Sequence, residues 1–361
     1  MLDFKRTYTF PFKYKIPSYV DAFLAKKFLF KARIKFIKRF LYILIRRQKS
    51  LEVYKINNED KRLLWINLSA PSLGDSLMDL SSRVLLENKK IDLFTDIKNA
   101  HLYSDDLFFS KIITEKREVN SQSYDLIIID SFSSKSIKIK TEIAPRLPYV
   151  GLFGFYNGPE VNRVLFSFHQ INNLIGYYHT ETRINEIAKS SIFISIRDKK
   201  TIDLLKLPTN FIAIVIGGEW KYRTYRDWVG VIKKLFLKDT RINLILIGSE
   251  NARDFEKEIL EAFPDSNIKS FVSKLTFNQT AQLIKKANFL FCCDGGLMHA
   301  TNAVGTIFIP LFARLEAEMQ LTVSSNAYPL YDIDDVNNIS AEKIIDRYIE
   351  AVNFDYSHRL S

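Results

Sequence analysis

A predicted strand, a glycine turn and a predicted helix follow one another around Asp294. The apolar run 288–293 predicts a buried strand of a parallel sheet, and Gly295 and Gly296 then open a helix that contains His299. Two glycines let backbone N–H groups approach a ligand closely, and the positive end of a helix favours an anion. The stretch therefore predicts a nucleotide diphosphate at this turn. The alternative is an ordinary strand–helix junction in which Asp294 caps the helix.

The rest of the chain alternates apolar runs with helical patterns, which is typical of α/β proteins. Strands are expected at 63–68, 91–95, 125–130, 149–155, 211–216, 242–247 and 269–272. Helices are expected at 76–87, 226–237, 250–263, 276–287 and 341–351. A chain of 361 residues, 47% of them hydrophobic, can bury two cores. We therefore expect two α/β domains with a ligand cleft between them.

These elements divide the chain into four expected segments. The first is a basic amphipathic extension at 1–58, and the second is an α/β domain at 59–190. The third is another α/β domain at 208–335, and the last is a helical segment at 336–361 that crosses back onto the first domain.

The excess positive charge is confined to the start of the chain. The net charge is +11, yet residues 1–50 alone hold 14 Lys and Arg against 2 Asp and Glu, so the remaining chain carries −1. A body without a net positive field does not favour a nucleic-acid partner. The only cysteines, Cys292 and Cys293, are neighbours in an apolar run, and the five histidines show no metal-like spacing. We expect a reduced, cytosolic protein without a disulfide framework or a zinc site.

The basic segment predicts an amphipathic helix at 21–49. Its apolar positions are Leu24, Phe28, Ile34, Ile37, Leu41 and Leu44, and its interleaved cations are Lys27, Lys31, Lys35, Lys38 and Arg46. Such a helix suits an anionic membrane surface, and the alternative is an accessory helix packed on the body with solvated lysines. No run is long enough to cross a bilayer and nothing resembles a secretory signal, so we expect the chain to stay cytoplasmic.

Four short motifs follow one another along the chain: Leu73-Gly74-Asp75, Lys221–Trp228, Gly248–Glu250 and Asp294–Ala300. In this order they resemble the IGD loop, the K-x-W-P-x-x-x-W segment, the G-x-x-E strand end and the D-[ST]-G-x-x-H signature of glycosyltransferase family 9. This family contains the bacterial lipopolysaccharide heptosyltransferases. The resemblance covers about residues 60–350 and leaves the first 58 as an extension that the family core lacks.

The resemblance implies an α/β GT-B fold with two Rossmann-like domains, and inverting transfer that needs no metal or other cofactor. The first domain would bind the acceptor and the second the nucleotide sugar. Asp75 would be the general base that takes the proton of a sugar hydroxyl as it attacks the anomeric carbon. Gly74 and Ser76 would lie on the acceptor side.

Without a metal, the charge on the leaving diphosphate must be met by N–H groups, a helix N-terminus and cations. The residues of these types in the motifs are Lys221, Arg223, Gly295 and Gly296. Glu250 would accept hydrogen bonds from the ribose hydroxyls, and Asp294 and His299 would contact the donor sugar or order the loop.

Each of these residues also has a purely structural alternative. Asp75 could cap a helix, and Lys221 could belong to a solvated turn. Glu250 could be a carboxylate at a helix N-terminus, and His299 could be a hydrogen-bonded core histidine.

The sequence hypothesis is a transferase that adds a heptose from ADP-heptose to a lipopolysaccharide or lipooligosaccharide core at the inner face of the inner membrane. Its partners would be the nucleotide sugar, the lipid-linked core oligosaccharide and, through the N-terminal segment, the anionic membrane surface. Gly295 replaces the family's Ser or Thr, and Arg223 with Thr224 replaces its Trp-Pro pair, so the donor is less firmly implied than the reaction. The alternatives are a same-fold transferase using another nucleotide sugar and a non-catalytic nucleotide-sugar-binding scaffold.

Overall fold

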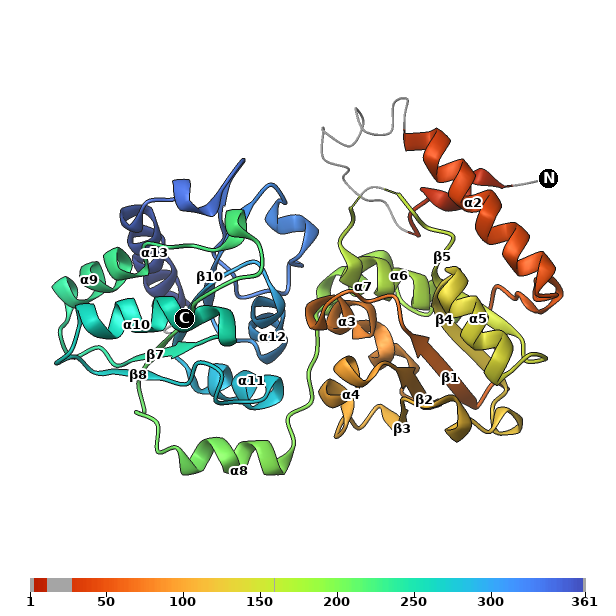
Figure 1. Ribbon diagram of the computed structural model, residues 1–361, viewed down its shortest axis with the longest axis horizontal. Helices are drawn as coiled ribbons and strands as arrows, with labels where there is room; N and C mark the ends of the chain where they lie inside the picture. Colours follow the sequence, from red (N-terminus) through yellow and green to blue (C-terminus); the bar gives the residue numbers. More distant parts are fainter. Residues whose placement is uncertain (1–2, 12–27, 159, 360–361) are drawn as a thin grey trace. The chain divides into compact units, whose positions relative to one another are not determined.

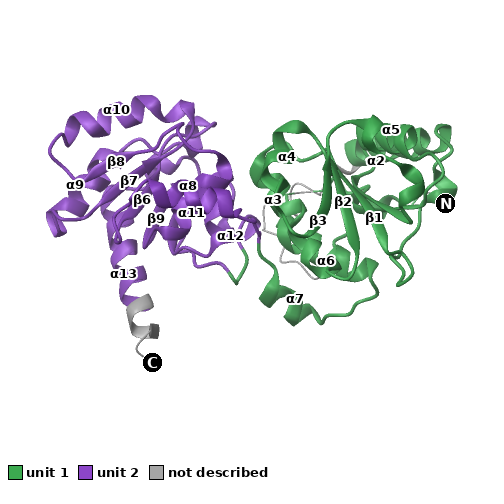
Figure 2. Ribbon diagram, turned by 90° about the horizontal axis from the view of Figure 1, so that it is seen from below, with its two compact units in different colours: residues 1–189, 322–324 green, residues 190–321, 325–361 purple. Residues whose placement is uncertain are grey.

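A computed structural model describes residues 3–11, 28–158 and 160–359 (Figure 1). The chain forms two compact units, Met1–Lys189 with Thr322–Ser324 as unit 1 and Ser190–Leu321 with Ser325–Ser361 as unit 2 (Figure 2). Each unit is built on one parallel sheet flanked by helices, which confirms the predicted α/β class with two Rossmann-like domains. Within the predicted extension at 1–58, the described residues 3–11 and 28–58 are grouped with unit 1.

The sheet of unit 1 has five strands in the order β3-β2-β1-β4-β5. The strands are β1 Arg62–Asn67, β2 Lys90–Thr95, β3 Phe109–Ile113, β4 Leu126–Ser131 and β5 Tyr149–Gly154. The helices are α2 Phe28–Ile45, α3 Leu73–Asp79, α4 Ile97–Tyr103, α5 Ser134–Ile143, α6 Arg163–Leu174 and α7 Glu181–Ile187. Strand β3 is absent from the predicted strands, because Ser110 and Lys111 interrupt its short apolar run at the edge of the sheet.

The sheet of unit 2 has six strands in the order β11-β10-β9-β6-β7-β8. The strands are β6 Ile212–Val215, β7 Leu244–Ile247, β8 Ile268–Ser270, β9 Phe289–Cys293, β10 Phe308–Ala313 and β11 Leu330–Asp332. The helices are α8 Ile196–Leu204, α9 Trp228–Lys238, α10 Arg253–Ala262, α11 Phe277–Lys286, α12 Gly296–Val304 and α13 Ala341–Arg359.

Strand β9 shows why these runs are continuously apolar. Phe289 and Phe291 pack in a core with α9 and α13, whereas Leu290 and Cys292 pack in a second core with α11 and α12. Successive side chains of a strand point to opposite faces, so a strand covered by helices on both sides needs apolar residues at every position. The two cysteines are buried and free, and burial raises the pKa of the Cys293 thiol to about 12.

Helix α3 begins earlier than the sequence predicted. The Oγ atom of Ser72 accepts a hydrogen bond from the backbone N–H of Asp75 at 3.2 Å, which makes Ser72 the N-cap. The helix then ends at Asp79 and a 3-10 helix follows at Ser81–Leu86, where a continuous helix from Ser76 to Glu87 was expected. Asp75 therefore lies inside the first helical turn.

The helix predicted at 21–49 is present as α2, and the expected positions Leu24 and Lys27 lie outside the described residues. One face of α2 packs on unit 1, where Phe36 and Ile43 join the core that contains Phe155. This face of α2 therefore agrees with the alternative prediction, an accessory helix packed on the body. No helix of the described residues is long and apolar enough to span a bilayer.

The last helix, α13, packs in the core of unit 2. Ile344 and Ile345 are buried in the core of unit 2, and the Tyr348 ring lies 4.8 Å from the Phe289 ring. These side chains pack on the sheet of unit 2, and the crossing of this segment back onto the first domain stays a prediction.

Replacing Phe36 with alanine should destabilise unit 1 by about 3 kcal/mol or more, since a fully buried aromatic side chain is lost. Denaturant unfolding followed through Trp65, the buried tryptophan of unit 1, measures this change. Phe30, whose side chain is 68% exposed on the same helix, is the matched control and should change the free energy of unfolding by less than about 0.5 kcal/mol when replaced. Equal effects of the two replacements would show that α2 is not packed.

Candidate functional site

The order of the strands in unit 1 reverses between β1 and β4, which pair in parallel. The connections from these two strands run in opposite directions, and the carboxyl ends of the strands form the usual ligand site of an open parallel sheet. The segment after β1 leads into α3, whose first turn contains Gly74 and Asp75, and Asp130 lies at the end of β4.

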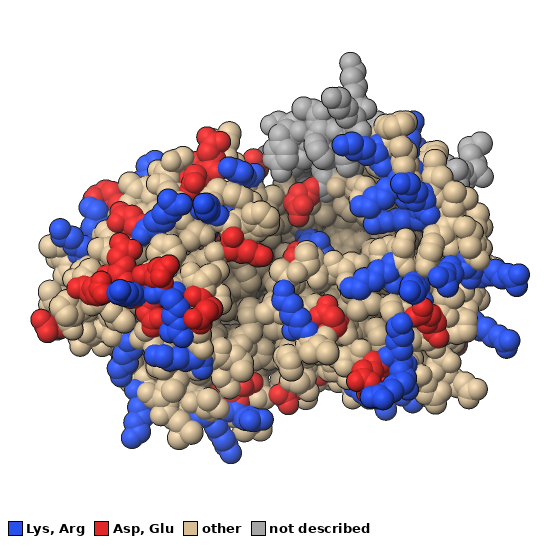
Figure 3. Space-filling view, viewed as in Figure 1, with Lys and Arg blue, Asp and Glu red and all other residues tan. Residues whose placement is uncertain are grey.

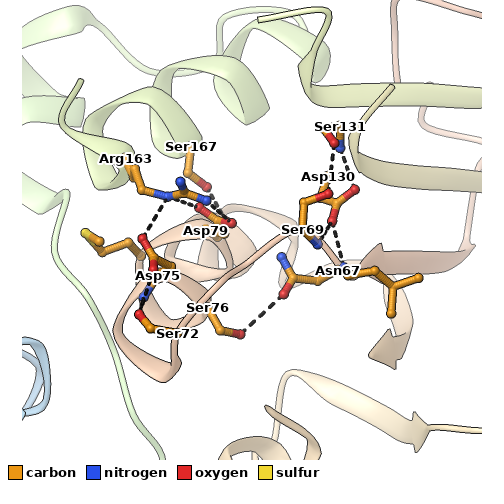
Figure 4. Close-up of polar contacts among 12 residues, drawn as sticks. Asn67, Ser69, Ser72, Asp75, Ser76, Asp79, Asp130, Ser131, Arg163 and Ser167 are labelled. Carbon is orange, nitrogen blue, oxygen red and sulfur yellow. Dashed lines mark hydrogen bonds and ion pairs between the residues drawn. The ribbon is translucent and has the colours of Figure 1, made fainter. Parts of the chain in front are cut away.

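The carboxylate of Asp75 is partly exposed, and one of its oxygens is fixed by a neighbouring hydroxyl (Figure 4). Its carboxylate accepts a hydrogen bond from the Oγ atom of Ser72 at 2.6 Å, and its side chain is 21% exposed. The Nε atom of Arg163 lies 3.7 Å from the other carboxylate oxygen. The N-cap of α3 is Ser72, so the capping role that the sequence left open for Asp75 is not the one it has.

Ser76 is not at the surface. It is fully buried, its Oγ atom lies 3.0 Å from the Tyr103 hydroxyl, and it donates a hydrogen bond to the Asn67 side chain. Because α3 begins at Leu73, position 76 faces the interior of unit 1. Gly74 is likewise buried, and the place of both residues on the acceptor side stays a prediction.

A buried ion pair beside Asp75 was missed by the sequence analysis. Asp79 is fully buried, and its two carboxylate oxygens accept hydrogen bonds from the Nε and Nη2 atoms of Arg163 at 2.7 and 2.6 Å. Burial raises the pKa of Asp79 to about 6 although Arg163 opposes this shift, and Asp79 outweighs burial to raise the pKa of Arg163. Two hydrogen bonds from the guanidinium to the two carboxylate oxygens are the geometry of an ion pair. The available signal was spacing, since Asp79 follows Asp75 by four residues on one helix.

Asp130 fixes the segment that leads from β1 into α3, the helix that carries Asp75. One of its oxygens accepts hydrogen bonds from the backbone N–H groups of Leu68 and Ser69, both at 2.6 Å (Figure 4). The other oxygen accepts a hydrogen bond from the Oγ atom of Ser136 at 2.9 Å. Burial raises the pKa of Asp130, and these hydrogen bonds oppose the rise. Asp130 therefore links the ends of β1 and β4 and fixes the position of the segment between β1 and α3.

In unit 2 the strand order reverses between β6 and β9, and β7 lies on the other side of β6. Lys221 and Arg223 follow β6, Glu250 follows β7, and Asp294 and Gly295 follow β9. The fold therefore brings the three predicted donor segments, which are far apart in sequence, to the carboxyl ends of three adjacent strands.

Arg223 and Asp294 form an ion pair across this edge. The Nη1 atom of Arg223 lies 2.5 Å from Asp294, whose side chain is only 3% exposed against 25% for Arg223. Burial lowers the pKa of Arg223, but Asp294 outweighs burial and leaves the pKa above its ordinary value. Asp294 thus holds a cation at this edge of the sheet, and its two predicted roles stay predictions.

Arg314 is a further cation that the sequence analysis did not identify. It follows β10, its guanidinium lies 4.1 Å from the centre of the Tyr222 ring, and the guanidinium of Arg223 lies 5.6 Å from the same ring. Cations over an aromatic ring are favourable, so Tyr222 keeps two guanidinium groups together at the ends of β6 and β10. No motif marked Arg314, because its partner is 92 residues away in the sequence.

The start of α12 has room for a ligand. Gly295 is the N-cap residue with an extended backbone, and an added Cβ atom would meet no atom of the described residues within 4 Å. Nothing within unit 2 therefore requires glycine here, and the N–H groups that begin α12 at Gly296 are open to an anion. Gly248 is different, because its Cβ would lie 2.5 Å from the carbonyl oxygen of Ile216.

The remaining predicted residues are placed as follows. Lys221 is exposed in the short 3-10 helix Lys221–Arg223. Glu250 is 77% exposed, and hydrogen bonding to Ser273, with Arg253 nearby, lowers its pKa. His299 is 3% exposed inside α12, so its position favours a role in ordering the loop over direct contact with a sugar. Within the described parts of the chain, no group of three or more His, Cys, Asp or Glu residues could hold a metal ion.

Part of the sequence is similar to a known protein family. The model of glycosyltransferase family 9 (heptosyltransferase) matches residues 157–330. No curated protein matches the sequence.

Three solved structures share the fold. A glycosyltransferase family 9 protein from Veillonella parvula has a TM-score of 0.67 at 13% identity, covering 82% of this chain and 98% of its own. The ADP-heptose lipopolysaccharide heptosyltransferase II of E. coli has a TM-score of 0.65 at 18% identity, covering 82% and 99%. The E. coli heptosyltransferase WaaC with ADP has a TM-score of 0.60 at 16% identity, covering 80% and 97%.

The two glycines of unit 2 should respond differently to alanine. Gly248→Ala should lower the free energy of unfolding by about 1–3 kcal/mol, because the new methyl group overlaps the backbone of Ile216. Gly295→Ala should leave stability within about 0.5 kcal/mol of the wild type. Thermal and denaturant unfolding of both variants measures this, and strong destabilisation by Gly295→Ala would mean that the glycine serves the fold.

Proposed function

We propose that this chain, whose residues 157–330 match the model of glycosyltransferase family 9 (heptosyltransferase), is a glycosyltransferase that transfers a heptose from ADP-heptose to a lipopolysaccharide or lipooligosaccharide core. We further propose that transfer inverts the anomeric centre and needs no metal. The observation that carries this proposal is the placement of the motif residues. Asp75 lies at the strand reversal of unit 1, and Lys221, Arg223 and Gly295 lie at that of unit 2.

Asp75 acts as the general base in this reaction. A sugar hydroxyl is a weak nucleophile, and a carboxylate within hydrogen-bond reach removes its proton as the oxygen attacks the anomeric carbon. The bond from that carbon to the diphosphate breaks in the same step, and displacement from the opposite side inverts the centre. Ser72 fixes one oxygen of Asp75, and the exposed part of the carboxylate is left to receive the proton.

The leaving diphosphate is stabilised by groups of unit 2. The N–H groups at the start of α12 face the space beside Gly295, and the exposed Lys221 and half-buried Arg223 supply positive charge. Donors aimed at developing charge stabilise a transition state without reorganisation, and each contributes about 3 kcal/mol. Arg314, held over Tyr222, adds a further cation. This set of cations and N–H groups offsets the charge in place of a metal ion.

Glu250 binds the ribose of the donor. Its carboxylate is exposed at the end of β7, next to the strand that leads to Lys221, and its oxygens can accept hydrogen bonds.

Helix α2 holds the enzyme at the inner face of the inner membrane, where the lipid-linked acceptor is found. Beside its buried face it exposes an apolar stripe with a spacing of four and three residues, formed by Phe30, Ile34, Ile37, Leu41 and Leu44. The helix has no acidic residue, and Figure 3 shows Lys and Arg side chains gathered over it. An apolar stripe flanked by cations is the pattern that binds an anionic bilayer surface.

Asp75→Ala should abolish transfer while ADP binding stays within about twofold of the wild type, because Asp75 belongs to unit 1 and the donor site to unit 2. Transfer assays with ADP-heptose and a core acceptor, together with calorimetric ADP titration, measure both quantities. Turnover retained by Asp75→Ala would remove Asp75 as the base.

Chelation of divalent metals should leave the rate of transfer unchanged, since cations and N–H groups of the chain offset the charge of the leaving group. The rate is compared before and after dialysis against EDTA, and again after Mg²⁺ is returned. A rate that is lost with EDTA and restored by Mg²⁺ would refute metal-independent transfer.

The double variant Ile34→Ser/Leu41→Ser should weaken binding to anionic vesicles by on the order of tenfold to a hundredfold, because two apolar side chains no longer enter the bilayer. Removing the whole segment is a poorer test, since Phe36 and Ile43 belong to the core. Leu237→Ser, at a 78% exposed position of α9, is the matched control. Unchanged vesicle binding by the double variant would rule out the stripe as the anchor.

A further inference from the structure

We infer that Asp79 and Arg163 are positioning residues that set the charge environment of Asp75, with Asp79 neutralising Arg163 so that Asp75 stays free to accept a proton. This inference rests on the proposed function, in which Asp75 is the base. It assigns a role in the reaction to a buried ion pair that belongs to no motif of the sequence.

The pair is rigid and fully engaged. Both oxygens of Asp79 are taken by Arg163, and the backbone carbonyl of Asp79 accepts a hydrogen bond from the Oγ atom of Ser167 at 2.6 Å (Figure 4). Arg163 and Ser167 both lie on α6, so α6 holds the end of α3 at two points. The guanidinium of Arg163 also lies over the Phe153 ring at 5.1 Å. These contacts leave Arg163 little freedom to move toward Asp75.

Asp75 lies close enough to Arg163 to interact with its charge, but the two side chains form no hydrogen bond. The 3.7 Å separation between the Nε atom of Arg163 and Asp75 is beyond hydrogen-bond distance, whereas the same Nε atom is 2.7 Å from Asp79. The Nε–H group is therefore committed to Asp79. The hydrogen bond that Asp75 accepts is from the neutral Ser72 hydroxyl, which fixes the carboxylate without neutralising it.

The other ionisable groups that act on this cluster are few. Asp79 also faces Asp130 at the end of β4 and the Tyr103 hydroxyl on α4, and Arg163 also faces Glu160. At neutral pH the cation and the two nearest carboxylates, Asp75 and Asp79, sum to one negative charge. Loss of either member of the ion pair therefore changes the charge beside Asp75 by one unit, with opposite sign in the two cases.

The two losses have opposite consequences for the base. Without the charge of Asp79, the whole positive charge of Arg163 acts on Asp75, stabilises its carboxylate and makes it a weaker base. Without Arg163, nothing offsets the repulsion between the carboxylates of Asp75 and Asp79, so Asp75 retains a proton to higher pH. A purely structural pair would produce the same loss of packing in both variants.

The test is the pH–rate profile of the full-length protein and of the variants Asp79→Asn, Arg163→Gln and the double variant. Asp79→Asn should move the acid limb of kcat to lower pH by about one unit and lower the plateau about two- to tenfold. Arg163→Gln should move the acid limb to higher pH. The double variant, which buries no lone charge, should bring the limb back toward the wild-type position, and the KM for the donor should stay unchanged in every case.

Asp105→Asn and Arg183→Gln are matched controls on the exposed surface of unit 1 and should leave the profile unmoved. The inference is overturned if the acid limb of kcat stays in place in both single variants, or if it moves in the same direction in both. The proposed function is not affected by that outcome. A wild-type protein that transfers no sugar overturns the proposed function and this inference together. If a single variant fails to fold, the double variant compared with the remaining single variant still gives the direction of one shift, and a shift of the wrong sign overturns the inference.

Discussion

Parallel pairing between strands that come from opposite halves of each sheet is the constraint on which the candidate site depends. In unit 1 it aligns β1 with β4, and in unit 2 it aligns β6 with β9. Because parallel strands end at one edge, loops far apart in sequence meet where the strand order reverses. Asp130 strengthens this arrangement in unit 1 by tying the end of β1 to the end of β4 through backbone N–H groups. The Arg223–Asp294 ion pair has the same effect between the loops after β6 and β9.

Much of this arrangement could be predicted from the sequence, because burial on both faces forces long apolar runs. Strand β9 and the turn at Gly295 are recognisable for that reason. The short edge strands β3 and β11 are not, since few of their residues are buried. Element boundaries were less predictable than element types: the Ser72 cap starts α3 early and turns Ser76 inward.

The missed residues are those whose roles depend on contacts between distant segments. Arg163 lies 84 residues from Asp79, and no local pattern links them. Asp79 could have been identified from the sequence, since its spacing from Asp75 places both residues on one side of α3. Arg314 likewise comes close to Arg223 only in the folded chain, where the guanidinium groups of both residues lie near the Tyr222 ring.

Helix α2 shows that the two interpretations of a basic amphipathic segment need not exclude each other. Its face with Phe36 and Ile43 completes the core of unit 1, and its other face exposes Phe30 and Leu41. A helix that is apolar on two sides can serve a core and a second surface together. The same helix therefore contributes to stability and supplies the surface proposed to meet the membrane.

The most direct test of the account is mass spectrometry of the lipopolysaccharide or lipooligosaccharide core from the source cells with and without this protein. The account predicts that cells without it lack one heptose together with every sugar attached beyond that heptose. Loss of a different sugar would contradict the proposed donor, and an unchanged glycan would contradict the proposed function.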